Sequence, residues 1–197
     1  MNKKLLIFDL DGTLSDTQPI LYTIVLETLR GCGIELSSLA DVYTSLEEHG
    51  KEVIELNALI TAEHLPLVNR EKYSVDFWDN YAKLCMGATE CVFDGIREAL
   101  SELKSRGYLL AVLSNKPNEA TEAVISHFLP NRFEIARGGI DGIPLKPDSA
   151  APLSLVKQLG GLASECAFVG DTSVDILTGR NMGACVTVGV SWGFRER

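Results

Sequence analysis

The stretch IFDLDGTLSD, Ile7 to Asp16, decides how this chain folds and raises its first chemical question. It begins inside a short apolar run, Leu5 to Phe8, of the kind that is typical of strands buried in a parallel sheet. Asp9 and Asp11 follow this run directly, and Gly12 comes next. With strand periodicity both carboxylates lie on one face, where two negative charges are unfavourable unless a cation neutralises them or one carboxyl stays protonated.

Three further apolar runs have the same character, and helical patterns separate them. The runs are LLAVL (109–113), CAFV (166–169) and CVTVGV (185–190), and all suit strands buried on both faces. The spacing predicts a helix capped by Asp94, a second that begins near Pro117 and a third that begins at Pro147. Strands that alternate with helices imply right-handed crossovers. We therefore predict an α/β fold with a Rossmann-like, mostly parallel sheet flanked by helices.

The segment 16–89 breaks this alternation. It shows no convincing strand, and its helical stretches include ILYTIVLETLRGCG (20–33), KEVIELNALITAEH (51–64) and REKYSVDFWDNYAKL (70–84). A strandless segment of this length, placed between the first strand and the next, indicates an all-helical insertion. We predict a catalytic core of residues 1–15 and 90–197 and a helical domain of residues 16–89.

Composition and charge narrow the classes of function. The chain has 197 residues, of which 46% are hydrophobic, and this suffices for a sizeable core. Its formal net charge of −9 disfavours nucleic acid and anionic membranes as partners. Carboxylates interrupt the N-terminal apolar run before it reaches the length of a signal-peptide core or a membrane span, so we expect a cytoplasmic protein. The sequence does not indicate the oligomeric state.

Polar side chains follow the predicted strands at their carboxyl ends. Besides Asp9 and Asp11, the groups are Ser114, Asn115 and Lys116 after the second run, Asp171 and Asp175 after the third, and Lys146 in the loop GGIDGIPLKP. Ligands of open parallel sheets bind outside this edge of the sheet. The set combines acidic groups for a divalent cation, hydroxyl and amide groups for anionic oxygens, and a further positive charge.

Each of these groups alone also has a structural explanation. The DxDG motif can be a solvated turn, Asp171 and Ser114 can cap the helices that follow them, and a lone Lys146 can be solvated. For the whole set this explanation weakens, because it requires four unrelated coincidences at one edge of one sheet.

Other ligand-binding motifs do not fit. An EF-hand counted from Asp9 has Leu14 in place of its glycine and Ile20 in place of its glutamate. No GxxxxGK[ST] loop occurs, and the nearest approach to GxGxxG has Leu36 in place of its last glycine. The sequence therefore gives no support for a nucleotide-binding loop.

Four motifs, in their order along the chain, resemble the haloacid dehalogenase-like hydrolase superfamily. They are DLDGTL (9–14), SNK (114–116), KP (146–147) and GDTSVD (170–175). The helical insertion is similar to the α-helical cap of that superfamily, and the ending GVSWGF is similar to its phosphoglycolate phosphatase-like branch. The second aspartate, Asp11, argues for phosphate chemistry over the dehalogenase branch.

The resemblance implies a Mg²⁺-dependent phosphatase that hydrolyses a small phosphorylated metabolite through an aspartyl-phosphate intermediate. In such an enzyme Asp9 is the nucleophile, and Asp11 gives and takes the proton. The resemblance assigns Asp9, Asp11 and Lys146 to catalysis, Gly12, Thr13, Ser114 and Asn115 to substrate binding, and Asp9, Asp11, Asp171 and Asp175 to Mg²⁺.

Two alternatives stay open at this point. A phosphomutase or a pyrophosphatase of the same fold is one, because the fold does not determine the reaction. A receiver-type signalling module that accepts a phosphoryl group is the other, although receivers are shorter and carry no helical insertion. Substrate specificity would come mainly from the helical cap.

Overall fold

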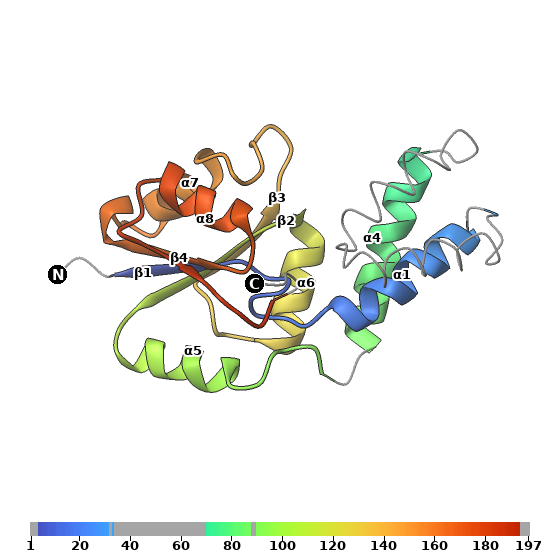
Figure 1. Cartoon of the computed structure of the whole chain (residues 1–197), viewed down its shortest axis with the longest axis horizontal. Helices are drawn as coiled ribbons and strands as arrows, with labels where there is room; N and C mark the ends of the chain where they lie inside the picture. Colours follow the sequence, from blue (N-terminus) through green and yellow to red (C-terminus); the bar gives the residue numbers. More distant parts are fainter. Residues whose placement is uncertain (1–3, 32, 34–69, 88–89, 194–197) are drawn as a thin grey trace. The chain divides into compact units, whose positions relative to one another are not determined.

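A computed structural model describes residues 4–31, 33, 70–87 and 90–193 of the chain (Figure 1). The chain divides into two compact units, one formed by residues 1–16 with 89–195 and the other by residues 17–88. The predicted roles of core and cap for these parts of the chain stay predictions.

A five-stranded parallel sheet forms the centre of the larger unit. Its strands are β1 (Leu5–Phe8), β2 (Leu109–Pro117), β3 (Ile135–Gly139), β4 (Cys166–Gly170) and β5 (Val186–Gly189). They lie in the order β3-β2-β1-β4-β5, so the first strand of the chain is central, and Leu5 pairs with both Leu109 and Cys166. The predicted α/β fold with a parallel sheet is confirmed.

Helices cover both faces of the sheet. Figure 1 shows α5 (Ile96–Ser105) and α6 (Asn118–Phe128) over one face, and α7 (Ala150–Gln158) and α8 (Ser173–Asn181) over the other. Leu5 and Ile7 of β1 belong to a buried cluster that also contains Leu155 of α7. Strand residues alternate between the two faces, and β1 contributes apolar side chains to both, so this strand is fixed inside the protein.

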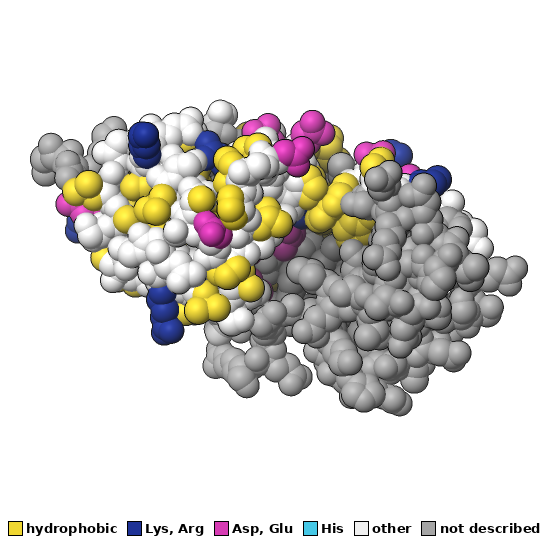
Figure 2. Space-filling model, turned by 90° about the horizontal axis from the view of Figure 1, so that it is seen from above, with side chains coloured by type: hydrophobic (Ala, Val, Ile, Leu, Met, Phe, Trp, Pro, Cys, Tyr) yellow, Lys and Arg dark blue, Asp and Glu magenta, His cyan; other side chains and the backbone are white. Residues whose placement is uncertain are grey.

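The outer surface of α7 and α8 carries apolar side chains among polar ones. Figure 2 shows this face, where hydrophobic side chains of the described residues lie scattered among polar and charged ones. Leu153 of α7 and Leu177 of α8 are 40% and 44% exposed. Scattered exposed leucines of this kind are ordinary for a protein surface.

Two sequence predictions about strands need correction. The strand β3 has no counterpart among the predicted apolar runs, because its sequence, IARGG, contains an arginine and two glycines. The run CVTVGV was predicted to be buried on both faces, but Val186 and Val188 of β5 are exposed. The reason is that β5 lies at the edge of the sheet, where neighbours cover it less completely.

Two predicted helix starts are also wrong. The N-cap of α5 is Gly95 and not Asp94, and its φ of 79° lies in the left-handed region that glycine adopts without strain. The helix α7 begins at Ala150 and not at Pro147. A turn closed by the Asp148 N–H and the Leu145 carbonyl occupies the preceding residues, and the Asp148 carboxylate accepts a hydrogen bond from the Ala150 N–H. The helix therefore starts only after this turn.

The smaller unit contains the helices α1 (Gln18–Gly31) and α4 (Arg70–Gly87), which pack against each other. Asn80 of α4 donates a hydrogen bond of 3.1 Å to the Thr28 hydroxyl of α1. The helix predicted over residues 70–84 is thus confirmed, and the one predicted over 20–33 is confirmed up to Gly31, since Gly33 lies in a turn. The helix predicted over 51–64 lies outside the described residues. Within the described ranges, none of the helices combines the length and apolar character that crossing a membrane requires.

Candidate active site

The DLDGTL segment forms a tight loop at the carboxyl end of β1. The Asp9 N–H donates to the Val169 carbonyl at 2.8 Å, so the pairing between β1 and β4 reaches this aspartate. The Leu10 carbonyl then accepts from the amides of Leu14 and Ser15 at 2.8 and 3.0 Å. This turn holds the buried Asp9 at the carboxyl end of the central strand, where ligands of open parallel sheets bind.

Gly12 brings this loop into close contact with Asp171. Its φ of 79° suits glycine, and a Cβ atom built on it would lie 2.2 Å from Asp171 Oδ2. Gly193, from the C-terminal part of the chain, approaches from another side, because its Cβ would lie 2.2 Å from the Asp171 Cβ. Gly12 therefore makes room for an acidic side chain, and its predicted role in substrate binding stays a prediction.

Three acidic side chains converge beside the sheet. Asp9, Asp171 and Asp175 each offer one carboxylate oxygen, and these oxygens all lie within 4.8 Å of one another. Lys146 lies among them, since its Nζ donates to Asp9 Oδ1 at 2.5 Å and to Asp175 Oδ1 at 2.7 Å. One ammonium therefore contacts two of the three carboxylates, and the third, Asp171, is half-buried, so the cluster carries more negative than positive charge.

The electrostatics of the cluster follow from its burial. Burial raises the pKa of the Asp9 carboxyl to about 7, against the lowering effect of the Lys146 ammonium and with a further raising effect of Asp175. Burial lowers the pKa of Lys146, but Asp9 and Asp175 outweigh it, so the pKa of this ammonium lies above its ordinary value. Lys146 thus stays charged, and an additional cation would favour the ionised form of Asp9.

Asp11 has a lysine partner of its own. Lys116 Nζ lies 2.8 Å from Asp11 Oδ1 and 2.7 Å from Oδ2, and the lysine side chain is 4% exposed. Each of the two carboxylates of the DxD motif therefore has a lysine partner, and the two lysines come from different parts of the chain. This arrangement explains how the chain can place both charges directly after a buried strand.

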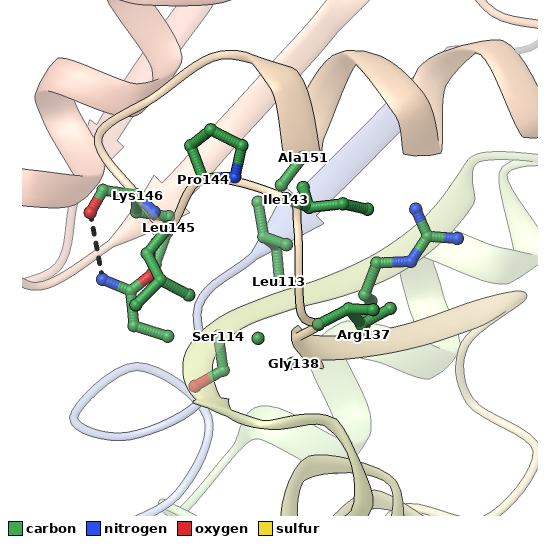
Figure 3. A pocket seen from close by; sticks show the side chains of 12 residues that line it. Leu113, Ser114, Arg137, Gly138, Ile143, Pro144, Leu145, Lys146 and Ala151 are labelled. Atoms are coloured by element: carbon green, nitrogen blue, oxygen red, sulfur yellow. Dashed lines mark hydrogen bonds between the residues drawn. The ribbon is translucent and has the colours of Figure 1, made fainter.

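The loop that carries Lys146 is braced by Asn115. The Asn115 side chain accepts from the Lys146 N–H at 2.8 Å and donates to the Lys146 carbonyl at 3.0 Å. Figure 3 shows the second of these bonds beside a small hollow that Ser114, Leu145 and other residues line. Asn115 positions the catalytic candidate Lys146, a contact that the predicted role in substrate binding did not include.

The start of α8 fixes the remaining acidic side chains. Thr172 is its N-cap, and Asp175 completes a capping box, since its Oδ2 accepts from the Thr172 N–H at 3.0 Å and the Thr172 hydroxyl at 2.6 Å. Capping was the structural alternative for Asp171, and the structure gives that role to Thr172. The Asp171 carboxylate instead accepts a hydrogen bond of 3.3 Å from the Thr13 hydroxyl.

The predicted site residues thus come together. Asp9, Lys146, Asp171 and Asp175 form one cluster, to which Thr13 and Gly12 are joined through Asp171, and Asn115 through Lys146. The Ser114 hydroxyl accepts from the Lys116 N–H at 3.2 Å, and Asp11 binds the Lys116 side chain. The functional assignments of these residues remain predictions.

Sequence reasoning missed two contacts at this site. Lys116 was named as a polar group at a strand end but received no role, although its place inside the SNK motif was the available signal. Trp192 donates a hydrogen bond of 3.1 Å to the Thr13 carbonyl across 179 positions. Its only signal was its place in the GVSWGF ending, which did not indicate a partner.

Comparison with known proteins agrees with this geometry. The family model of the haloacid dehalogenase-like hydrolases matches residues 3–183. The chain belongs to this family. Proteins named phosphoglycolate phosphatase are similar over almost the whole chain. The protein of Colwellia psychrerythraea is 28% identical, and the match covers 98% of this chain and 86% of the relative. The protein of Psychrobacter arcticus is 31% identical, with the same shares covered.

A solved structure gives the same result. The crystal structure of a candidate phosphoglycolate phosphatase from Lactobacillus delbrueckii subsp. bulgaricus has a TM-score of 0.74 and 28% identity, and the match covers 100% of this chain and 89% of that one. The predicted superfamily, its phosphoglycolate phosphatase-like branch and the predicted enzyme class, a phosphatase, are confirmed. A receiver-type signalling module is thereby excluded.

Proposed function

We propose that this haloacid dehalogenase-like hydrolase is a Mg²⁺-dependent phosphatase that hydrolyses a small phosphate monoester through an aspartyl-phosphate on Asp9. The observation that carries the proposal is the buried Asp9 carboxylate, which lies at the end of the central strand against Lys146 and two further carboxylates. The names of the relatives support 2-phosphoglycolate as the first substrate to test.

The residues of the chain can perform both halves of the reaction. An Asp9 oxygen attacks phosphorus while the bond to the leaving oxygen breaks, and Asp11 gives that oxygen the proton that completes the alcohol. In the second half a water molecule attacks the aspartyl-phosphate, Asp11 takes back a proton, and inorganic phosphate and the free Asp9 carboxylate result. Lys146 Nζ contacts Asp9 Oδ1, so its charge is in place to stabilise phosphoryl oxygens at this carboxylate.

The acidic cluster fits a magnesium ion. Carboxylate oxygens are the ligands that Mg²⁺ prefers, and Asp9, Asp171 and Asp175 bring three within 4.8 Å, with more negative charge than Lys146 balances. We propose that Asp9, Asp171 and the Asp11 carbonyl bind the ion, with Asp175 helping directly or through water. When bound, Mg²⁺ would neutralise the repulsion between the Asp9 carboxylate and the phosphate dianion.

The test is phosphate release from a panel of small phosphate esters that includes 2-phosphoglycolate, measured with Mg²⁺ and with a chelator. We expect release only with metal, and we expect Asp9→Asn to lower kcat by at least about 1,000-fold, because the amide keeps the shape of the side chain but removes the nucleophile. Asp148→Asn is the matched control, since the Asp148 carboxylate is exposed and accepts a hydrogen bond only from the Ala150 N–H among the contacts that the structure gives it at the start of α7.

Three outcomes would contradict the proposal. Retention of more than a few per cent of activity by Asp9→Asn would show that Asp9 is not the nucleophile. Conversion of a phosphorylated sugar to an isomer without release of phosphate would identify a mutase, and release from pyrophosphate alone would identify a pyrophosphatase.

A further inference from the structure

The ion pair between Lys116 and Asp11 has a geometry that a solvated surface pair does not have. Lys116 Nζ contacts both oxygens of one carboxylate, at 2.8 and 2.7 Å, and the lysine side chain is 4% exposed against 22% for that of Asp11. A lysine ammonium removed from water to this extent is costly unless a charged partner compensates it. The pair therefore fixes where the Asp11 carboxylate lies.

The backbone of Lys116 is itself held firmly. Its N–H donates to the Ser114 hydroxyl at 3.2 Å at the end of β2. On the neighbouring strand, a Cβ atom on Gly138 would lie 2.3 Å from the Lys116 carbonyl oxygen, so β3 packs directly against this peptide. A side chain that starts from such a fixed backbone can hold its partner in one position.

The two lysines of the site have separate carboxylates. Lys146 binds Asp9 and Asp175, whereas Lys116 binds Asp11. In the proposed reaction Asp9 must reach phosphorus, and Asp11 must reach the leaving oxygen and later a water molecule. Proton transfer of this kind depends on close and correct placement of the carboxyl group.

We propose that Lys116 is a positioning residue that holds the Asp11 carboxyl where it exchanges a proton with the leaving group. The inference rests on the proposed function, because it assigns a role to a residue of the same site. Lys116 acts here through Asp11 and does not itself react.

The test compares esters whose leaving groups need the proton to different degrees. An alkyl phosphate such as 2-phosphoglycolate leaves as a strongly basic alkoxide unless it is protonated, whereas p-nitrophenyl phosphate leaves as a stable phenolate. Lys116→Met keeps the length and apolar stem of the side chain and removes its charge, and Lys116→Arg restores a charge that can bind both oxygens. Lys104→Met is the control, because it removes a half-buried lysine that pairs with a different carboxylate, that of Glu134, at 3.4 Å.

For Lys116→Met we expect kcat on the alkyl phosphate to fall by about 100-fold and kcat on p-nitrophenyl phosphate by no more than about threefold, with KM little changed. Lys116→Arg should recover most of the loss. In an Asp11→Asn background, Lys116→Met should change kcat on the alkyl phosphate less than about threefold, because the partner through which it acts is already disabled.

Equal losses on both esters, or the same loss with and without Asp11→Asn, would overturn the positioning role and leave the proposed function intact. A large rise in KM with kcat unchanged would assign Lys116 to substrate binding and would also overturn it. Circular dichroism and melting curves verify that Lys116→Met is folded, and if it is not, Lys116→Gln takes its place. Failure of the wild type to release phosphate from any ester would reject the proposed function and this role together.

Discussion

Gly12 is a residue at which the backbone approaches the acidic cluster too closely for a side chain. Its φ of 79° is costly for any residue with a side chain, and a Cβ atom there would overlap the Asp171 carboxylate. We expect Gly12→Ala to lower the free energy of unfolding by about 2–4 kcal/mol, as a clash in a packed site does. Urea unfolding measures this loss, and if the cluster binds Mg²⁺ as proposed, a titration should show weaker binding because Asp171 is displaced.

Gly95→Ala is the matched control for this prediction. Gly95 has the same φ of 79°, but a Cβ atom there would meet nothing within 4 Å. Gly95→Ala should therefore lower the free energy of unfolding only by the backbone contribution, about 1 kcal/mol, and leave the proposed Mg²⁺ binding unchanged. Equal effects of the two substitutions would show that the contact with Asp171 has no energetic weight.

At the scale of elements, Glu90 ties the chain entering α5 to that helix. Its carboxylate accepts hydrogen bonds from the amides of Cys91 and Val92 at 3.0 and 2.9 Å and from Arg97 at 3.0 Å. Burial opposes ionisation, but the hydrogen bonds from Val92, Arg97 and Cys91 outweigh it and lower the pKa of Glu90 below its ordinary value of 4.5. The folded state thus favours the ionised carboxylate.

The sign of the pH dependence follows from this lowered pKa. The contribution of Glu90 to stability is present above its unfolded pKa of 4.5 and is lost as the pH falls through the lower pKa of the folded state. Because the side chain is half exposed, we expect Glu90→Gln to lower the free energy of unfolding at pH 7 by only about 0.5–1 kcal/mol, and the difference from wild type to shrink below pH 4.

Urea unfolding at pH 7 and at pH 3.5 measures the effect of Glu90→Gln. Glu98→Gln changes the net charge equally on the neighbouring helix without touching these hydrogen bonds, and it serves as the control. A difference between Glu90→Gln and wild type that grows toward low pH would contradict the prediction.

The elements also show how far local sequence determines this fold. The runs at β1 and β4 are continuous and apolar because neighbours cover them on both faces, so they were predictable. The strand β3 was not predictable from its own sequence. Its Gly138 is required because the strand packs closely against the Lys116 carbonyl, and the local sequence of β3 does not reveal this neighbour. The predicted start of α7 was wrong for a similar reason. The turn closed by the Asp148 N–H and the Leu145 carbonyl takes the place of the first helical turn that was expected after Pro147.

The site was predictable to the extent that its chemistry lies in short motifs at strand ends. Asp9, Lys146, Asp171 and Asp175 could be grouped because the carboxyl ends of parallel strands meet at one edge of a sheet. Two other contacts could not be predicted, because each joins distant positions and depends on the direction of a side chain. Lys116 pairs with Asp11 across 105 positions, and Trp192 donates to Thr13 across 179.

At the scale of the whole molecule, the chain leaves the larger unit and returns to it at one place. The Asp16 N–H donates to the Cys91 carbonyl at 2.6 Å, and Ser15 forms an antiparallel bridge with Val92. Both ends of the 17–88 segment are therefore tied together by hydrogen bonds that belong to the larger unit. This geometry predicts that the larger unit does not need the segment in order to fold.

We expect a chain in which a Gly/Ser linker of about four residues replaces residues 17–88 to unfold cooperatively, since a short connection suffices between hydrogen-bonded ends. If the acidic cluster binds Mg²⁺, saturating metal should raise the melting temperature of this shortened chain, because a ligand that binds only the folded state stabilises it by mass action. Asp171→Asn in the same shortened chain should remove the metal-dependent shift and leave the transition cooperative. A broad, non-cooperative transition would show instead that the 17–88 segment is part of the core, and the predicted division into two domains would be wrong.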